Sequence, residues 1–458
     1  MQININFMPR SKNLFIVGGT VRDILLNRPP RDYDIVTTDD PMDAATQIAA
    51  LSGGRVIKLG KPGMHLYRVT SGRIECDVTA AGKESIISDL MARDFTVNAM
   101  AVSTAGGDLI DPANGRRDLE KKVIRMISGK NLTADPIRFL RAWRLAAELE
   151  FSISPETLEA IRADGHMVVR SAGERIRDEL IKFFAAPVSA DYIADFAGAR
   201  MISAIFPGIN DLKECIQNAY HDFDVFHHTL KTYAGLEAIL NRPASADLSD
   251  KRIMDFFSAP ANRPLLKCAA LLHDIGKPAV RTTDDTGRVH FYGHEKVGAN
   301  MAGNICRNLR FSNHQTHYVK TIIGHHLRPL FLFTAHQKCR LGQKAVSRFF
   351  MQTSPHSIDL LLLAAADAMG KGAGSDSGGF TKFADILITD YIDGFLPIVT
   401  APSLISGHDI MSEFGLPPSP LIGEIMHYIK EQRLISTIRN REDALGRIKN
   451  FLKHRSPS

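Results

Sequence analysis

Cysteine is sparse in this chain of 458 residues: there are five, scattered and without a CxxC pair. Such a set excludes a disulfide-stapled framework and argues against a zinc ribbon. No apolar run reaches the ~18 residues that a membrane-spanning helix needs. The N-terminus also lacks the charged-then-apolar layout of a signal peptide. We therefore expect a cytoplasmic protein with no membrane partner.

Excess charge is also small, because 56 Lys and Arg face 50 Asp and Glu, for a net charge of +6. This value is compatible with a nucleic-acid partner and equally with ordinary solvated faces, since only clustered charge makes a binding surface. Hydrophobic residues make up 44% of the chain and charged residues 23%, which excludes a disordered protein. At roughly 150 residues per domain, the length suggests about three domains.

Histidine, by contrast, is concentrated in one part of the chain. Twelve of the 17 histidines lie between His221 and His356, which is less than a third of the sequence. Histidine gathers where metals are bound or protons are transferred. The composition therefore separates a histidine-poor beginning from a histidine-rich middle.

The hydrophobic pattern changes along the chain as well. Short apolar runs predict early strands, at Leu14–Val17, Asp34–Thr38, Arg55–Leu59 and Ile74–Thr79, with helices between them at Val21–Asn27 and Asp43–Leu51. After Asn131 a 3.6-residue period predicts helices, at Ile137–Leu149, Pro155–Arg162, Glu174–Phe184, Lys382–Ile392 and Leu421–Gln432, with a flexible loop at Gly370–Gly379. The sequence thus predicts a mixed α/β head followed by a mostly α-helical body.

Two glycines and three aspartates stand out in the head. Gly18 and Gly19 lie between a strand and a helix, where backbone N–H groups can bind a phosphate, although an ordinary turn is the alternative. Asp32 and Asp34 share one face of a strand, and Asp77 lies in a later strand. Neighbouring carboxylates repel unless a cation lies between them, and oxygen ligands suit the Mg²⁺ of a nucleoside triphosphate. Together they favour a metal site over solvated turn aspartates.

The segment that carries these residues, LFIVGGTVRDILLNRPPRDYDIVTT at 14–38, resembles the signature of the class II tRNA nucleotidyltransferase and bacterial poly(A) polymerase family. The resemblance implies an α+β nucleotidyltransferase head of the polymerase-beta-like kind. It implies that Asp32 and Asp34 hold catalytic Mg²⁺, to which Asp77, from a neighbouring strand, is expected to add a third catalytic carboxylate. Gly18, Gly19 and Arg22 would then contact the nucleotide.

Further blocks match the family in order. RDFTVNAM, at 93–100, resembles its second motif, which implies nucleotide contacts from Arg93, Asp94 and Asn98. The segment 111–119 resembles the connector between domains, 134–151 (ADPIRFLRAWRLAAELEF) the fourth motif and 174–180 (ERIRDEL) the fifth.

The fourth block has a physical logic of its own. Asp135 and Arg138 are three residues apart and share a helix face, so they can offer an acceptor and donors to a base edge. The resemblance implies that they read the incoming CTP or ATP, with Arg141 holding phosphate. The alternative is that Asp135, which precedes Pro136, caps the helix and Arg138 is a surface residue.

Two departures from the family leave the added nucleotides open. Ala134 stands where the family has Glu, and the segment Thr79–Arg93 is short where many members carry a longer flexible loop. Complete CCA addition, CC alone, A alone and poly(A) all remain possible products.

A second constellation occupies the histidine-rich region. His273 and Asp274 follow an apolar helical run, in AALLHDIGKP, and this adjacent pair is typical of a metal site or of catalysis. The series resembles an HD-domain metal-dependent phosphohydrolase. The resemblance implies core ligands at His228, His273, Asp274 and Asp367, with His294 and His326 as the extra ligands of two-metal members. His317, His325 and His336 are expected to be ordinary histidines.

The sequence therefore predicts an RNA 3′-end nucleotidyltransferase that acts on tRNA with CTP and ATP, with Mg²⁺ in its head and a divalent transition metal or Mg²⁺ in its HD domain. The predicted regions are a head (1–125), a helical nucleotide- and RNA-binding neck (126–215), an HD domain (216–380) and a basic RNA-binding tail (381–458). The alternatives are a poly(A) polymerase and a phosphohydrolase whose head only binds RNA.

Overall fold

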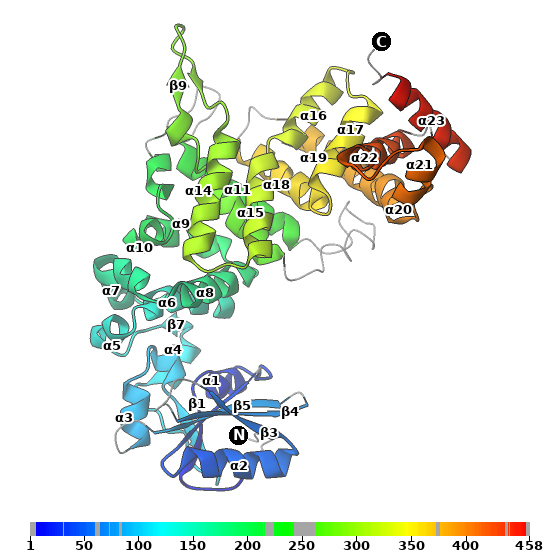
Figure 1. The fold of residues 1–458 in the computed structure, drawn as a ribbon. Coiled ribbons are helices and arrows are strands. Elements are labelled where there is room, and N and C mark those ends of the chain that lie inside the picture. The colour runs from blue at the N-terminus through cyan, green and yellow to red at the C-terminus, as the bar shows by residue number, and fades with distance from the viewer. Residues whose placement is uncertain are drawn as a thin grey trace. The chain divides into compact units, whose positions relative to one another are not determined.

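The computed structural model describes residues 6–30, 32–59, 65–72, 74–81, 85–213, 215, 224–241, 262–371, 376–435, 438 and 440–454. The chain divides into two compact units, Met1–Ile205 and Phe206–Ser458, whose elements are labelled in Figure 1. The boundaries predicted at 125, 215 and 380 stay predictions. Part of the predicted loop Gly370–Gly379 lies outside the described residues, and its ends belong to two helices.

Unit 1 opens with a six-stranded mixed sheet in the order β3-β4-β5-β2-β1-β6. Its strands are β1 (Leu14–Val17), β2 (Tyr33–Thr37), β3 (Arg55–Leu59), β4 (Leu66–Ser71), β5 (Ile74–Ala80) and β6 (Ala101–Ser103). β2 and β5 pair in parallel, and the other neighbours pair antiparallel. All four residues of β1 are buried, because a run without a polar side chain suits an inner strand. The predicted mixed α/β head is confirmed.

The helices of the head follow local signals. They are α1 (Gly19–Leu25), α2 (Pro41–Ser52), α3 (Ile86–Met91) and a 3₁₀ turn, η1 (Thr96–Asn98). Asp40 caps α2 by accepting from the backbone N–H groups of Met42 and Asp43, and Pro41 fills its first turn. α1 packs against β1 and β2, and α2 against β4 and β5.

The remainder of unit 1 is almost entirely helical. It contains α4 (Gly115–Glu120), α5 (Gly129–Ala134), α6 (Ile137–Leu149), α7 (Pro155–Asp164), η2 (Gly165–Arg170), α8 (Gly173–Ala185), α9 (Ala190–Gly198) and α10 (Arg200–Ile205), with the short pair β7 (Val123–Ile124) and β8 (Ser152–Ile153). α6 packs against α8, and this contact brings the fourth and fifth sequence blocks together.

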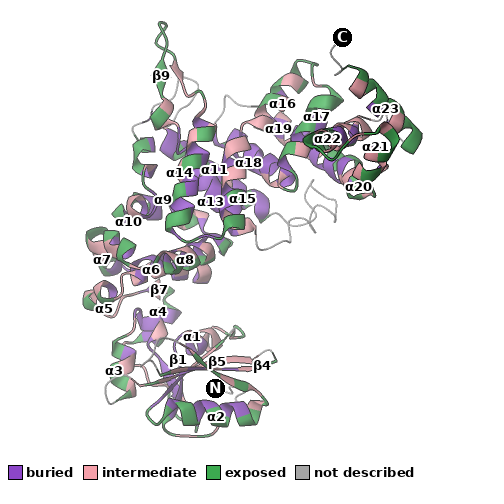
Figure 2. Cartoon of the chain, viewed as in Figure 1, coloured by how far each residue is buried: buried purple, intermediate pink, exposed green. Residues whose placement is uncertain are grey.

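Unit 2 is a helical assembly with one hairpin. It contains η3 (Ile209–Lys213), α11 (Val225–Leu240), α13 (Arg263–Leu272), η4 (Pro278–Val280), β9 (Thr282–Thr283), β10 (Val289–His290), α14 (His294–Asn308), α15 (Asn313–His325), α16 (Arg328–Gln337), α17 (Gln343–Thr353), α18 (Ser357–Gly370), α19 (Ser377–Thr389), the π-helix η5 (Asp390–Phe395), α20 (Leu396–Thr400), α21 (Gly407–Phe414), α22 (Pro420–Leu434) and α23 (Arg441–Lys453). Figure 2 shows buried residues along α11, α13 and α18. The last three helices enclose a separate apolar cluster that includes Ile410, Ile425 and Ile448.

Among the helices that the structure describes, none has both the length and the apolar character needed to cross a membrane. The cytoplasmic location stays a prediction.

Candidate functional site

The sheet register places the head's aspartates near one another. Asp34 on β2 stands opposite Asp77 on β5 in the parallel pair, and Asp32 directly precedes β2. Thr20 of α1 fixes this strand, because its hydroxyl accepts from the Asp34 backbone N–H at 2.9 Å and donates to the Asp32 carbonyl at 3.2 Å. Burial raises the pKa of Asp34. The negative charges of Asp32 and Asp77 raise it further, whereas the positive charges of Arg93 and Arg22 lower it, and the net shift is upward. A divalent cation beside Asp34 would offset this burial and repulsion and would be stabilising there.

Gly18 leaves room for this arrangement. It has a φ of 67°, and a Cβ added there would lie 2.6 Å from Nη1 of Arg93 and 3.1 Å from Oδ2 of Asp34. The backbone thus approaches both side chains as only glycine allows. The next glycine, Gly19, begins α1 and faces the Arg22 guanidinium. Arg22 in turn donates to Oδ1 of Asn98 at 2.8 Å, which joins the first and second sequence blocks.

Asp77 has a partner that the sequence did not indicate. Arg68 on β4 donates from Nε and Nη2 to its two carboxylate oxygens, at 2.7 and 2.8 Å. Two groups of three ligand residues have their ligand atoms within 4.8 Å of one another among the described residues, and both groups lie in unit 2. Asp32, Asp34 and Asp77 do not form such a group. The catalytic roles of Asp32, Asp34 and Asp77 stay predictions.

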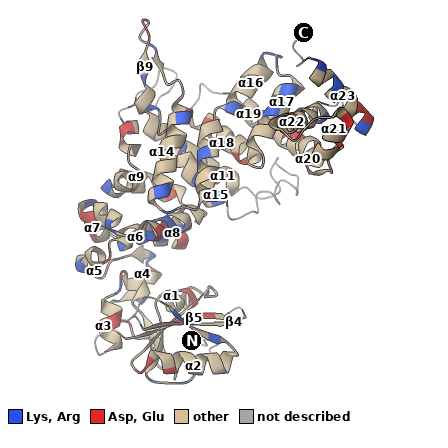
Figure 3. Ribbon diagram, viewed as in Figure 1, with Lys and Arg blue, Asp and Glu red and all other residues tan. Residues whose placement is uncertain are grey.

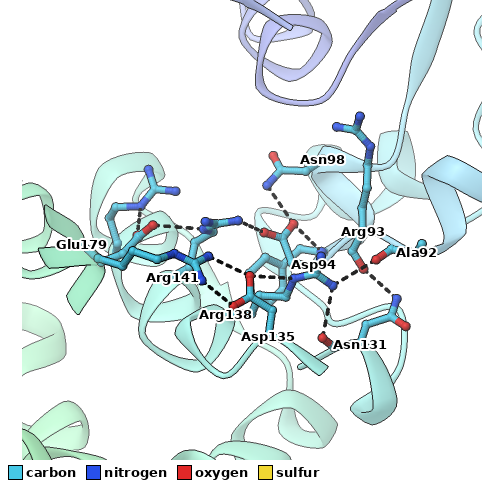
Figure 4. A network of polar contacts seen from close by, with 12 residues as sticks. Ala92, Arg93, Asp94, Asn98, Asn131, Asp135, Arg138, Arg141 and Glu179 are labelled. Carbon is cyan, nitrogen blue, oxygen red and sulfur yellow. Dashed lines mark hydrogen bonds and ion pairs between the residues drawn. The ribbon is translucent and has the colours of Figure 1, made fainter. Parts of the chain in front are cut away.

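Asp94 is the centre of a buried polar network (Figure 4). Its Oδ1 accepts from the Phe95 backbone and from Asn98, and its Oδ2 accepts from Nη1 of Arg141 at 2.8 Å. Burial alone would raise the pKa of Asp94, but the charge and hydrogen bond of Arg141 hold it below its usual value. Asp94 therefore links the head to α6, and its predicted contact with the nucleotide stays a prediction.

Glu179 on α8 completes this network. It accepts from Nε of Arg141 at 3.1 Å and from Nε of Arg144 at 2.6 Å, and Figure 4 shows Arg141 between Asp94 and Glu179. Arg141, predicted to hold phosphate, is thus engaged by two carboxylates. Glu179 lies in the fifth sequence block but had no predicted role, because periodicity does not reveal which residue of α8 faces which residue of α6.

Asp135 and Arg138 lie on one side of the start of α6, as their spacing predicted, with 3.9 Å between Asp135 Oδ2 and Arg138 Nε. Arg138 donates from Nη1 to the carbonyls of Ala92 and Asn131, at 3.0 and 3.1 Å. The alternative in which Asp135 caps this helix is not what the structure has, because the N-cap is Pro136 and has no side-chain bond.

Arg175 from α8 faces Asp135. Its two terminal nitrogens donate to Oδ1 and Oδ2 of Asp135, at 2.9 and 2.8 Å. Burial raises the pKa of Asp135, but the Arg175 hydrogen bonds outweigh it and hold the pKa below its usual value. The carboxylate is therefore ionised and oriented, and Arg175, which belongs to the fifth sequence block, had no predicted role.

The histidines predicted as ligands converge in unit 2. With two aspartates they form two buried groups. One group contains His228, His273 and Asp367, and the other contains Asp274, His294 and His326. His228 Nε2 lies 2.8 Å from Asp367 Oδ1, and His273 Nε2 lies 3.2 Å from Asp274 Oδ2. The ligands come from α11, α18, the end of α13, the start of α14 and the residue after α15. His325, predicted to be an ordinary histidine, is outside both groups.

The histidine tautomers show that these groups fit a cation. Nδ1 of His273, His294 and His326 lies 2.7 to 2.8 Å from a backbone carbonyl, so in a neutral ring Nδ1 carries the hydrogen and Nε2 is the atom that can bind a cation. Nε2 of His294 lies 3.3 Å from Nε2 of His326 and 3.3 Å from Oδ1 of Asp274. Three acceptors that face one another repel unless a cation lies between them.

Lysine side chains neutralise the carboxylates from outside. Lys277 Nζ lies 2.6 Å from Asp274 Oδ2, and Lys371 Nζ lies 2.8 Å from Asp367 Oδ2. Burial raises the pKa of both aspartates, but the histidines and lysines hold it well below the usual value. Neither lysine was singled out in the sequence.

Comparison with known proteins identifies the family. The A-adding tRNA nucleotidyltransferase of Deinococcus radiodurans is 32% identical over 437 residues, which cover 94% of this chain and 93% of that protein. The chain belongs to the tRNA nucleotidyltransferase family. A CC-adding tRNA nucleotidyltransferase of Thermus thermophilus is 28% identical and covers 94% of this chain, with 92% of its own length matched.

Family models and solved structures agree with this placement in the tRNA nucleotidyltransferase family. Residues 14–125 match the "Poly A polymerase head domain", 150–213 the "Probable RNA and SrmB- binding site of polymerase A" and 225–369 the "HD domain". A CCA-adding enzyme in complex with ATP shares the fold, with a TM-score of 0.64 at 19% identity over 97% of this chain and 91% of that one. The resemblance stated from the sequence is confirmed, as is the fold class.

Proposed function

We propose that the head transfers CMP, AMP or both from CTP and ATP to the 3′ end of tRNA. The observation that carries the proposal is Asp34, which has Asp32 and Asp77 as neighbours and the backbone of Gly18 so close that an added Cβ would lie 3.1 Å from its Oδ2. In the reaction the RNA 3′-hydroxyl attacks the α-phosphate, the bond to the β-phosphate breaks and pyrophosphate leaves with the electron pair. Bound Mg²⁺ would stabilise the charge that develops on these oxygens.

Within this proposal the nucleotide-reading residues are Asp135 and Arg138. The bidentate bond from Arg175 fixes one edge of the Asp135 carboxylate and keeps it ionised, and Arg138 is anchored on two carbonyls. Side chains held in this way can discriminate bases without rearranging. Relatives are named as A-adding and as CC-adding enzymes, so the added nucleotides stay open between A, CC, CCA and, as an alternative, poly(A).

The basic tail supports RNA as the partner. Arg441, Arg447, Lys449 and Lys453 lie on α23, and Figure 3 shows the basic residues along this helix. Arg439 and Arg455, also predicted as part of this basic tail, lie outside the described residues. Glu442 and Asp443 also lie on this helix, so its positive charge is a modest excess, which favours phosphate contacts without regard to base sequence.

The deciding experiment is nucleotide incorporation with the Asp34→Ala variant. Wild-type protein is offered tRNAs that end before, within and after the CC sequence, with each labelled triphosphate, and the products are sequenced. We expect Asp34→Ala to abolish incorporation, and Asp108→Ala, at an exposed loop residue of the same unit, to leave it unchanged. Retained incorporation in Asp34→Ala would sink the assignment, and long A tails on unrelated RNA would favour the poly(A) alternative.

We further propose that unit 2 is a metal-dependent phosphohydrolase. The three converging acceptors Asp274, His294 and His326 support it, because such a set holds a divalent ion that can supply a nucleophilic hydroxide. The test is hydrolysis of 2′,3′-cyclic AMP by chelator-treated protein to which Mg²⁺, Mn²⁺, Co²⁺ or Ni²⁺ is returned. Nucleotide addition without any hydrolysis would limit the protein to its transferase activity, and hydrolysis without addition would favour the phosphohydrolase alternative.

A further inference from the structure

The hairpin of β9 and β10 ends in a rigid turn that holds one histidine ring. Oδ1 of Asp284 accepts from the hydroxyl and backbone N–H of Thr286 and from the backbone N–H of Arg288, at 2.6 to 3.0 Å. Its Oδ2 lies 2.7 Å from Nε2 of His290. The bonds from Thr286 and His290 hold the pKa of Asp284 well below its usual value. A charged partner thus fixes the His290 ring.

Tyr292 stacks on that ring. The two ring centroids are 5.1 Å apart and the planes differ by only 9°. Tyr292 is nevertheless 77% exposed, more than any other large apolar or aromatic side chain that the structure describes. One face of the phenol lies on His290, so the opposite face is open to solvent and is already oriented.

The same short segment continues into the metal-ligand groups. The carbonyl of Phe291 accepts from Nδ1 of His294 at 2.8 Å, and Lys277 Nζ lies 5.6 Å from the Phe291 ring centroid and 2.6 Å from Asp274 Oδ2. Tyr292 is two residues from His294, so their Cα atoms are at most about 7 Å apart. An open aromatic face and a candidate hydrolytic centre are therefore joined by a single fixed loop.

We propose that Tyr292, backed by His290, stacks on the nucleobase of the substrate that the HD centre hydrolyses. This inference rests on the proposed hydrolytic function and names its substrate class, a nucleoside phosphoester rather than a sugar phosphate or inorganic ester. Stacking on an aromatic face tolerates every base, so the site suits RNA ends of any sequence. In the hydrolysis water adds to phosphorus, one bond from phosphorus to a ribose oxygen breaks and that oxygen takes the proton.

The kinetic test compares a substrate with and without a base. Tyr292→Ala raises the KM for 2′,3′-cyclic AMP by about tenfold, Tyr292→Phe restores it, and neither variant changes the KM for 1-O-methylribose 2,3-cyclic phosphate. The control is Ile386→Ala, at an exposed apolar residue of α19. Equal effects of Tyr292→Ala on both substrates would show that the ring only supports the loop.

A binding test needs no turnover. Full-length protein stripped of metal is photolabelled with 8-azidoadenosine 2′,3′-cyclic phosphate and digested with trypsin. We expect label on the peptide Val289–Lys296, reduced about tenfold in Tyr292→Ala and kept in Tyr292→Phe. Label that is unchanged in Tyr292→Ala, or that is absent from this peptide, overturns the proposal. If the peptide is labelled but the protein hydrolyses the substrate with none of the metals, base stacking on Tyr292 is supported and the proposed hydrolytic function is overturned.

Discussion

Gly18 determines how closely the backbone can approach the Asp34 carboxylate. With a φ of 67°, a side chain at this position is strained, and its Cβ would collide with Nη1 of Arg93 at 2.6 Å. The collision is relieved when the guanidinium of Arg93, the flexible end of a side chain paired with Asp89 at 3.1 Å, moves away from the site. Glycine here serves the site rather than the turn alone.

We therefore expect Gly18→Ala to lower kcat/KM for nucleotide incorporation by at least roughly tenfold, since strain of this kind costs about 1–3 kcal/mol and displaces Arg93. The matched control is Gly53→Ala. Gly53 has nearly the same φ, 66°, but no atom within 4 Å of an added Cβ, so its replacement affects stability and leaves activity intact. Steady-state incorporation assays with both variants provide the measurement, and equal losses would refute the local explanation.

The same residues show what a sequence reveals at this scale. Gly18, Asp32 and Asp34 could be proposed from the sequence because the pattern that marks them lies within one strand and turn. The bonds of Asp77 to Arg68 and of Asp135 to Arg175 could not, because each joins segments whose register or helix rotation is set by packing. A residue type and spacing predict what a side chain can do, and tertiary contact decides which partner it has.

Among the elements, α6 and α8 owe their contact to charge as much as to apolar packing. Glu179 of α8 has a side chain only 10% exposed and accepts from Arg141 and Arg144, which come from successive turns of α6. Removing its charge leaves two arginines without their shared partner. Because Arg141 also binds Asp94, the loss extends to the second sequence block.

Glu179→Gln is expected to destabilise unit 1 by about 2–3 kcal/mol, the range for charged hydrogen bonds of buried groups. The protein has one tryptophan, Trp143, and it is buried in α6, so its fluorescence follows the unfolding of this unit. Glu120→Gln provides the control, because its ion pair with Arg116 is about two-thirds exposed and is worth less than about 1 kcal/mol. Similar urea midpoints for the two variants would contradict the assigned role of Glu179.

α18 carries a buried carboxyl outside the metal-ligand groups. Asp359 accepts from the Tyr318 hydroxyl at 2.9 Å, and burial raises its pKa from 3.8 to about 6. Between these two values the unfolded chain releases its proton while the folded chain keeps it. The contribution of Asp359 to stability therefore falls as pH rises through this window and stays low above it.

Asp359→Asn is accordingly expected to stabilise unit 2 by about 1–3 kcal/mol at pH 8, from roughly 1.4 kcal/mol per pKa unit, and to have almost no effect near pH 4. Calorimetric scans at both pH values measure the difference. The exposed carboxyl of Glu413 on α21 supplies a control, Glu413→Gln, that shows no such dependence. If Asp359→Asn did not raise the free energy of unfolding at pH 8, the hydrogen bond from Tyr318 would offset the cost of burying the charged carboxylate.

Element positions followed from local patterns to within a few residues. The strand predicted at Asp34–Thr38 is Tyr33–Thr37, and the helix predicted at Leu421–Gln432 is Pro420–Leu434. A helix predicted at Lys382–Ile392 instead begins at Ser377 and passes into the π-helix Asp390–Phe395. The apolar period persists through a π-helix, so it does not mark the change.

At the scale of the whole molecule, the sequence showed a head and a helical remainder but not where the units divide. The structure separates them at Ile205 and Phe206, within a region where helical periodicity is the same on both sides. Only the histidine excess distinguishes the second unit, and it begins later, at His221. The histidine excess marks where the metal-ligand groups lie, whereas the boundary between the units is set by packing contacts that composition does not reveal.

The division into units predicts that the two proposed activities can be removed separately. The groups assigned to nucleotide transfer, Asp32 and Asp34, belong to Met1–Ile205, and the HD ligands belong to Phe206–Ser458. Asp34→Ala should abolish incorporation into tRNA and leave cyclic-phosphate hydrolysis within about twofold of wild type, and Asp274→Asn should do the reverse, because each site draws its groups from one compact unit with its own core. Both activities are assayed on the same preparations of full-length protein. Loss of both activities in Asp274→Asn, with the Trp143 fluorescence unchanged, would show instead that the centres depend on one another.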